Sequence, residues 1–113
     1  MTFTEARSQF EQHMRRIGRS SNTIETYDRN LGGFSAFLTE YYPRITSVSE
    51  VSLDVTRDYQ DYLIGFKDLG KPLSGSTIQL KLVSLRTFFA FLSREDYLPS
   101  NPTKQIVLPK SPK

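Results

Sequence analysis

The chain has 113 residues, of which 37% are hydrophobic and 24% charged, and these proportions predict one small globular domain. It contains no cysteine and a single histidine, His13, so disulfides, thiolate nucleophiles and zinc–thiolate sites are excluded and we expect neither a metal nor a cofactor. Residues 1–10 do not resemble a signal peptide, and no run of about 18 apolar residues occurs, so we expect a cytoplasmic protein without a membrane-spanning helix.

Charge is distributed unevenly along the chain, although the net charge is only +3. Residues 1–39 carry five basic and four acidic groups, residues 40–70 three and six, and residues 71–113 seven and two. An acidic middle and a basic final third suggest one face turned toward a polyanion and another turned away. A solvated surface with randomly scattered charges explains the charges equally well.

Two helices are predicted in the N-terminal part from apolar spacings of three to four. The first begins with a capping box at Thr2 and ends at Gly18, and its expected core residues are Phe3, Ala6, Phe10, Met14 and Ile17. The second begins with a capping box at Asn22 and is stopped by Pro43. Its apolar stripe comprises Ile24, Tyr27, Leu31, Phe34, Leu38 and Tyr41.

The middle of the chain predicts a short connection and a third, acidic helix. Ser47 and Glu50 can cap a single turn, and the helix is expected over residues 53–69. Its inward residues are Val55, Tyr59, Tyr62, Leu63 and Phe66. Its exposed face carries Asp54, Asp58, Asp61 and Asp68.

After a loop marked by Gly70 and Pro72, a capping box at Ser76 opens a fourth helix with the stripe Ile78, Leu82, Leu85, Phe89 and Leu92. Phe91 lies off this stripe, and core packing is favoured over an exposed patch for a partner. No useful strand alternation appears anywhere. Because the prolines after the fourth helix cannot continue it, we assign residues 1–103 to a helical domain and residues 104–113 to a linker toward an attached domain.

Two of these helices have outward faces that are almost free of acidic residues. At about 100° per residue, the positions opposite the stripe of the second helix are Asn22, Thr26, Arg29 and Gly33, with Thr23 and Asn30 at a margin and Glu25 near the edge. The corresponding positions of the fourth helix are Ser76, Gln79, Val83, Arg86, Thr87 and Ala90, with Lys81 and Ser84 on a flank.

Small polar, amide and arginine side chains at this spacing suit a helix that lies in a DNA groove. Arginine and glutamine reach base edges, whereas serine, threonine and asparagine reach phosphates. A helix N-terminus also favours a phosphate through its free N–H groups and its dipole. A structural explanation competes with this one, because Asn22 and Ser76 are already accounted for as N-caps and the other residue types decorate any solvated helix.

Three landmarks in order resemble one protein family. The run Ser21–Leu31, followed by Phe34 and Phe37, resembles the opening of the core-binding domain of tyrosine site-specific recombinases, the phage integrase group. The run from Ser76 to Leu92 resembles the last long helix of that domain, and residues 97–102 resemble the turn and Asn-Pro pair that lead into the catalytic domain. The likeness covers about residues 3–110.

The resemblance implies an all-α fold, a SAM-like bundle of four to five helices that forms one half of a C-shaped clamp around DNA. Carried over position by position, the DNA-binding residues are Asn22, Thr23, Thr26, Arg29, Ser76, Gln79, Lys81 and Arg86. The family often has two basic residues where this chain has Leu80 and Lys81. One phosphate contact is therefore missing or is supplied elsewhere, for example by Arg15, Arg16 or Arg19.

Catalysis in the family depends on a downstream domain that holds two arginines, a lysine, histidines or substitutes, and a tyrosine nucleophile. This chain ends at Lys113, so we expect a DNA-binding fragment with no catalytic residue rather than an enzyme. Its implied partners are double-stranded DNA, its own catalytic domain and, on DNA, further copies. The six tyrosines of the chain are interpreted as core or helix-end residues, because a nucleophilic tyrosine needs converging cations.

A helical protein-interaction module is the alternative function, because fold does not fix function. It predicts that the acidic third helix or an aromatic patch carries binding, with no particular salt dependence. DNA binding predicts that the second and fourth helices carry it, and that affinity falls steeply as salt rises because counterions are released.

Overall fold

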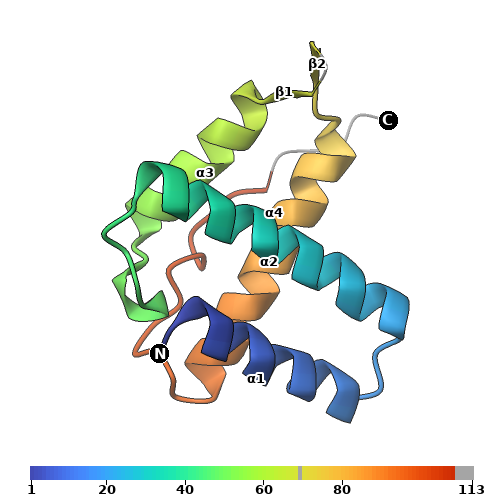
Figure 1. The fold of residues 1–113 in the computed structure, drawn as a ribbon, viewed down its shortest axis with the longest axis vertical. Coiled ribbons are helices and arrows are strands. Elements are labelled where there is room, and N and C mark those ends of the chain that lie inside the picture. Colours follow the sequence, from blue (N-terminus) through green and yellow to red (C-terminus); the bar gives the residue numbers. More distant parts are fainter. Residues whose placement is uncertain (69, 109–113) are drawn as a thin grey trace.

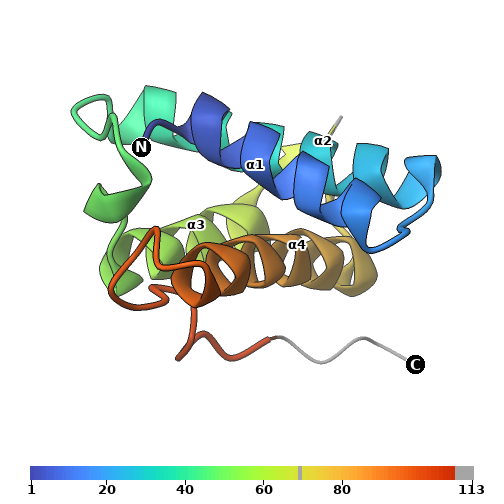
Figure 2. The ribbon, with the colours of Figure 1, turned by 90° about the horizontal axis from the view of Figure 1, so that it is seen from below.

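Helices arranged in two layers make up the structure, a computed structural model that describes residues 1–68 and 70–108. In chain order the elements are α1 (Phe3–Arg16), α2 (Ser21–Tyr41), the 3-10 turn η1 (Val48–Glu50), α3 (Leu53–Gly65), β1 (Lys67–Asp68), β2 (Lys71–Pro72) and α4 (Gly75–Arg94). The pair α1 and α2 lies over the pair α3 and α4, and α2 crosses α4 (Figures 1 and 2). The predicted all-helical bundle is therefore confirmed, and no described helix is long and apolar enough to cross a bilayer.

The first helix begins and ends where the sequence predicts. The Thr2 hydroxyl accepts a hydrogen bond from the Glu5 backbone N–H (3.1 Å), and the Glu5 carboxylate accepts one from the Thr2 backbone N–H (3.0 Å). The bond from the Thr2 backbone, reinforced by its side chain, lowers the pKa of Glu5 below the usual value. Gly18 has φ +82°, a conformation that suits glycine. Ile17 is 54% exposed, so its predicted place in the core is wrong: it lies beyond the last helical residue.

The N-caps of α2 and α4 are Ser20 and Ser74, not Asn22 and Ser76 as predicted. Each cap hydroxyl accepts a hydrogen bond from the backbone N–H three residues later and donates to the hydroxyl of that residue, Thr23 in α2 and Thr77 in α4. Each helix thus starts two residues earlier than expected. Several neighbouring polar residues can serve as N-caps at each of these positions, and the spacing to Glu25 or Gln79 predicted the wrong one.

The corrected caps predict a difference between two serines of the same helix. Ser74→Ala is expected to lower the free energy of unfolding by about 1 kcal/mol, because the Thr77 N–H loses its acceptor. Ser76→Ala changes an exposed side chain in the first turn and should leave stability within about 0.5 kcal/mol of the parent. Urea unfolding followed by circular dichroism measures both. Equal losses in the two variants would contradict this cap assignment.

The third helix is shorter than predicted because a hairpin follows it. The capping box of Ser47 and Glu50 around η1 is confirmed. Beyond Gly65, β1 and β2 pair antiparallel with Lys67 opposite Pro72, and strands of two residues leave no alternation for the sequence to display. The predicted helical position 69 and the side chain of Asp68 lie outside the described residues, whereas the other three aspartates of this helix are exposed as expected.

Phe34 of α2 lies at the centre of the core, where all four helices meet. Its ring centroid is 6.0 Å from Phe3 of α1, 4.9 Å from Tyr59 of α3 and 6.2 Å from Phe89 of α4. Phe91, placed off the predicted stripe, is 4% exposed, which confirms core packing. Its contact with Phe10 ties α4 to α1.

A buried polar pair marks the crossing of α2 and α4. The Asn30 amide donates a hydrogen bond to the Ser84 hydroxyl (2.9 Å), and that hydroxyl donates to the Leu80 carbonyl oxygen. Both side chains were expected at the edge of the outward faces, and this expectation is wrong because the two helices contact each other there and bury both residues. Gly33 was also predicted on the outward face, but it lies against α3. A Cβ atom added to it would be 3.6 Å from the Tyr59 hydroxyl oxygen.

The segment after α4 folds back along the α3–α4 layer (Figure 2). The Thr56 hydroxyl donates to the Pro102 carbonyl (3.2 Å), and the Gln60 amide donates to the Val107 carbonyl (2.9 Å). Ile106 is buried. Packing therefore continues past the predicted domain boundary at residue 103, and residues 109–113 of the predicted linker lie outside the described residues.

Candidate nucleic-acid interface

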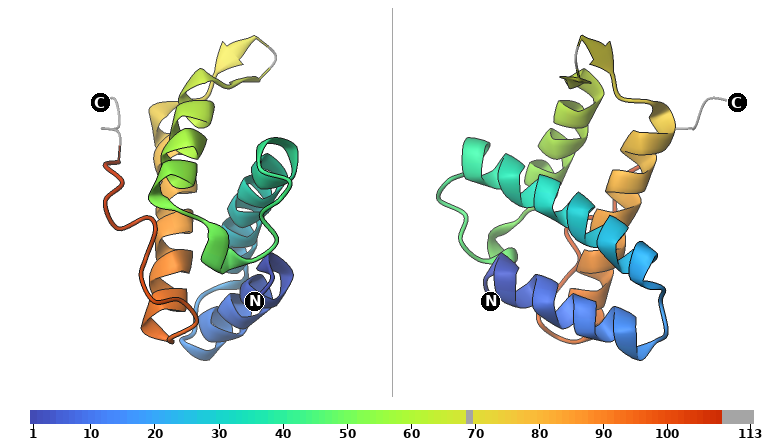
Figure 3. Two further views of the ribbon diagram at one scale, coloured as in Figure 1. Left: turned by 90° about the vertical axis from the view of Figure 1, so that its left-hand side faces the viewer. Right: turned by 45° about the vertical axis from the view of Figure 1, so that its right-hand side comes forward.

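The structure places the eight predicted DNA-binding residues on two helices that cross. Four are exposed, namely Asn22, Arg29, Ser76 and Arg86. The other four are half-buried, namely Thr23, Thr26, Gln79 and Lys81. The two helices touch at their middles, where Asn30 binds Ser84, and diverge toward their N-termini (Figure 1 and, from other sides, Figure 3).

The side chains of Asn22 and Ser76 do not stabilise the helix starts at which they lie. Ser20 and Ser74 provide the caps, and the side chains of Asn22 and Ser76 make no hydrogen bond among residues 1–68 and 70–108. Each residue lies in the first turn of its helix, beside backbone N–H groups that lack an intrahelical acceptor. The competing explanation of both residues as N-caps is therefore wrong, and both side chains are available to a ligand.

The two threonines of α2 differ in what they can offer to a phosphate. Phosphate oxygens need donors. The Thr26 hydroxyl already donates to the Asn22 carbonyl (3.0 Å), which leaves it only lone pairs. The Thr23 hydroxyl accepts from Ser20 (2.9 Å), so its own proton remains available. Of the pair, Thr23 is the better phosphate ligand.

The first turns of α2 and α4 differ in charge from those of α1 and α3. Neither has an acidic residue in its first turn, whereas α1 has Glu5 and α3 has Asp54. No acidic residue occurs anywhere in α4. A carboxylate in the first turn would compensate the positive end of the helix dipole, so α2 and α4 keep uncompensated positive ends.

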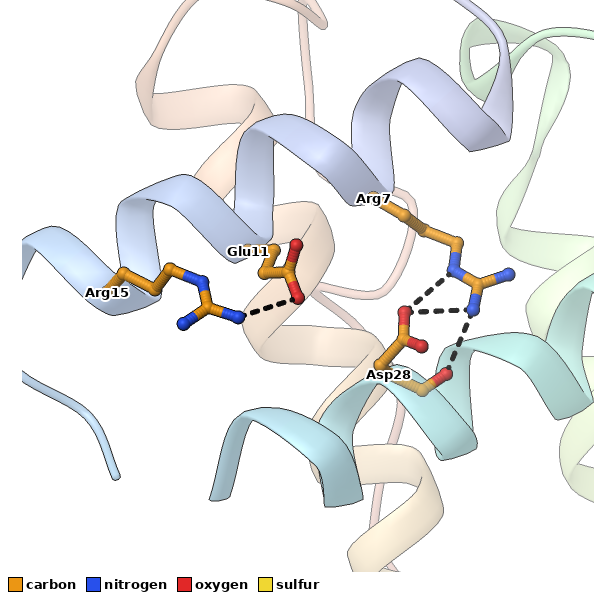
Figure 4. A network of polar contacts seen from close by, with 4 residues as sticks. All are labelled: Arg7, Glu11, Arg15 and Asp28. Carbon is orange, nitrogen blue, oxygen red and sulfur yellow. Dashed lines mark hydrogen bonds and ion pairs between the residues drawn. The ribbon is translucent and has the colours of Figure 1, made fainter. Parts of the chain in front are cut away.

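The arginines on these two faces form no ion pair with any described residue. The two ion pairs in the described part of the chain join Arg7 to Asp28 (2.8 Å) and Arg15 to Glu11 (3.3 Å) (Figure 4). Arg7 reaches from α1 and neutralises Asp28, the carboxylate next to Arg29 in sequence. The positive charges of Arg29 and Arg86 are therefore not offset by a partner of their own.

Lys104, which belongs to the predicted linker, lies beside the predicted face of α4. A groove of about 290 Å³ on the outward side of α4 is lined by Val83, Arg86, Thr87, Ala90, Asn101 and Lys104. Only the fold-back of the chain after α4 brings Lys104 to this position. A basic residue shortly after the Asn-Pro turn was the one available signal in the sequence.

Packing explains Tyr59 and His13, and a hydrogen bond explains Tyr42. Burial raises the pKa of Tyr59 to about 12, which opposes formation of a nucleophilic phenolate. The Tyr42 hydroxyl donates to the Asp58 carboxylate, and this bond raises the pKa of Tyr42. His13 is half-buried, with its ring 4.7 Å from that of Phe91. No group of three His, Asp or Glu side chains in the described chain could hold a metal ion.

Comparison with known proteins gives a consistent result. The profile of the family described as "Phage integrase, N-terminal SAM-like domain" matches residues 8–96. Tyrosine recombinase XerC of Oceanobacillus iheyensis is 31% identical over 83% of this chain and 28% of its own length. XerD of the same organism is 31% identical over 87% of this chain and 32% of its own length.

Tyrosine recombinase XerC of Listeria monocytogenes is 36% identical over 74% of this chain and 25% of its own length. The chain thus spans about a quarter to a third of the length of these relatives. Its fold also matches the crystal structure of the N-terminal domain of a phage integrase/site-specific recombinase from Haloarcula marismortui. The TM-score is 0.81 over 96% of this chain and 97% of that one, at 18% identity.

Proposed function

Because this chain belongs to the family of phage integrase N-terminal SAM-like domains, we propose that it binds double-stranded DNA at a recombination site through the outward faces of α2 and α4. The observation that carries the proposal is the shared character of these two faces. Each face has a first turn without a carboxylate. Each also has a polar side chain in that turn and an arginine further along, and neither side chain binds any described residue.

The charges of the two helices suggest which one enters the major groove and which one contacts the DNA backbone. B-DNA's major groove is about 12 Å wide and admits one helix. We assign that place to α4, because it carries no acidic residue over its length, whereas α2 exposes Glu25. In this arrangement α2 lies against the adjoining backbone, where Asn22, Thr23 and Arg29 donate to phosphates.

Strand cleavage and rejoining would belong to a separate catalytic domain, as the tyrosine recombinase family implies. This chain would form one half of a clamp on the DNA and would position the catalytic half. Self-association of the whole recombinase on DNA belongs to the same proposal.

A protein-interaction role is the second candidate, favoured by an aromatic surface where α2 and α3 end. Tyr41 is 52% exposed and Phe66 37%, so their predicted inward positions are wrong: Tyr41 is the last residue of α2 and Phe66 follows the last residue of α3. Both rings lie 5.6 Å from that of Tyr62. Exposed Glu40 and Asp61 lie nearby in sequence. This surface is distinct from the outward faces of α2 and α4, so binding measurements can separate the two functions.

Fluorescence anisotropy on a labelled mixed-sequence duplex, titrated with salt, tests the proposal. We expect affinity to fall by about a hundredfold between 50 and 200 mM salt, since three to four phosphate contacts each contribute a logarithmic slope of about −0.9. Asp61→Ala on α3 is the control and should bind equally well or slightly more tightly. No binding at 50 mM salt, or binding that salt does not weaken, would refute DNA binding by these faces.

A further inference from the structure

The groove on the outward side of α4 joins two cations that come from different parts of the chain. Arg86 lies near the middle of α4, and Lys104 lies on the segment that folds back after it. Val83 and Ala90 contribute short apolar side chains to the lining, and Thr87 contributes a hydroxyl. None of the described residues that line the groove is acidic.

Lys104 is carried by a well-anchored turn. The Asn101 side-chain oxygen accepts hydrogen bonds from the Thr103 backbone N–H (2.8 Å) and hydroxyl (2.6 Å), and the Lys104 N–H donates to the Asn101 carbonyl (3.2 Å). Thr103 is fully buried, and Ile106 is 6% exposed. A cation on such a turn loses less backbone freedom when it binds than one on a loose tail would.

The positive charge of the groove has no counterpart in the described chain. Arg86 and Lys104 are both exposed, and neither forms an ion pair with a described residue. A larger groove of about 540 Å³ lies between η1 and residues 98–105, and among its described lining residues only Lys104 is charged. Only the α4 side therefore offers two cations together.

We propose that Arg86 and Lys104 form a phosphodiester-binding site that holds one backbone phosphate of the bound DNA. This inference rests on the proposed function and adds to it a residue from outside the two helices. Paired cations with a hydroxyl donor suit a phosphate, and the short side chains of Val83 and Ala90 let the DNA backbone approach closely. The same site would bind DNA to the segment that follows α4, because Lys104 belongs to that segment.

Lys104→Ala, assayed by the same salt titration, tests the inference. We expect its logarithmic salt slope to be smaller by about 1 and its affinity at 100 mM salt to be lower by about fivefold to tenfold. Lys104→Arg keeps the charge and should keep the parental slope. Arg57→Ala, which removes one exposed cation from α3, is the matched control and should retain the slope.

Coupling with Arg86 sharpens the test. If both cations hold one phosphate, the double variant Arg86→Ala/Lys104→Ala should lose less affinity than the product of the two single losses. A parental slope in Lys104→Ala, together with a reduced slope in Arg29→Ala, would overturn this inference and leave the proposed function standing. Absence of salt-dependent binding in the parent protein would overturn both.

Discussion

Replacing both Arg29 and Arg86 by alanine is expected to lower the affinity for duplex DNA by about a hundredfold at 100 mM salt. Each substitution removes one charged contact of roughly 1–3 kcal/mol. The arginines lie on different helices with no shared partner in the described chain, so their effects should add. The slope of log affinity against log salt should become shallower by about 2, as anisotropy titrations measure.

The matched control removes the same charge from other surfaces. Arg44 follows α2 and Arg57 lies on α3, and both are exposed. The double variant Arg44→Ala/Arg57→Ala should bind within about threefold of the parent, because remote charges are screened at a Debye length of about 10 Å. Equal losses in the two double variants would mean that net charge alone drives binding and would contradict a defined interface.

Phe34→Ala is expected to have the largest effect on stability, about 3–5 kcal/mol in the free energy of unfolding. The ring contacts side chains from α1, α3 and α4, so its removal leaves a cavity where all four helices meet. Domains of this kind are stable by only about 5–15 kcal/mol. Urea unfolding at 25 °C should therefore show a much lower midpoint or a partly unfolded protein.

Tyr41→Ala provides the comparison, because it removes an aromatic ring from the same helix at a position that is 52% exposed. We expect a loss below about 1 kcal/mol, in keeping with surface substitutions. A loss for Phe34→Ala no greater than that for Tyr41→Ala would show that the core is not organised around Phe34.

Periodicity predicted the helices well, because an amphipathic helix must repeat its apolar residues every three to four positions to bury them. The stripe of the fourth helix, from Ile78 to Leu92, is buried throughout. Helix boundaries were harder to predict, since neighbouring serines compete as caps and only the fold selects Ser20 and Ser74. The hairpin after α3 leaves no periodic trace because each of its strands has two residues.

The candidate site shows a different limit. A helical wheel gives the direction of a side chain from its own helix, but it does not show where a neighbouring helix crosses. Asn30 and Ser84 were therefore predicted near the surface, although their hydrogen bond is buried at the crossing. The position of Lys104 beside Arg86 depends on a turn that brings together residues distant in sequence, and no local pattern contains that information.

Mapping the amide resonances of the ¹⁵N-labelled protein during titration with duplex DNA tests the proposed interface most directly. We expect the largest shifts in residues 20–30 and 74–90, with a second group around Lys104, and we expect that raising the salt concentration reverses them. Shifts confined to α3 and the aromatic surface around Tyr41 and Tyr62 would contradict the assignment and favour a protein-interaction role.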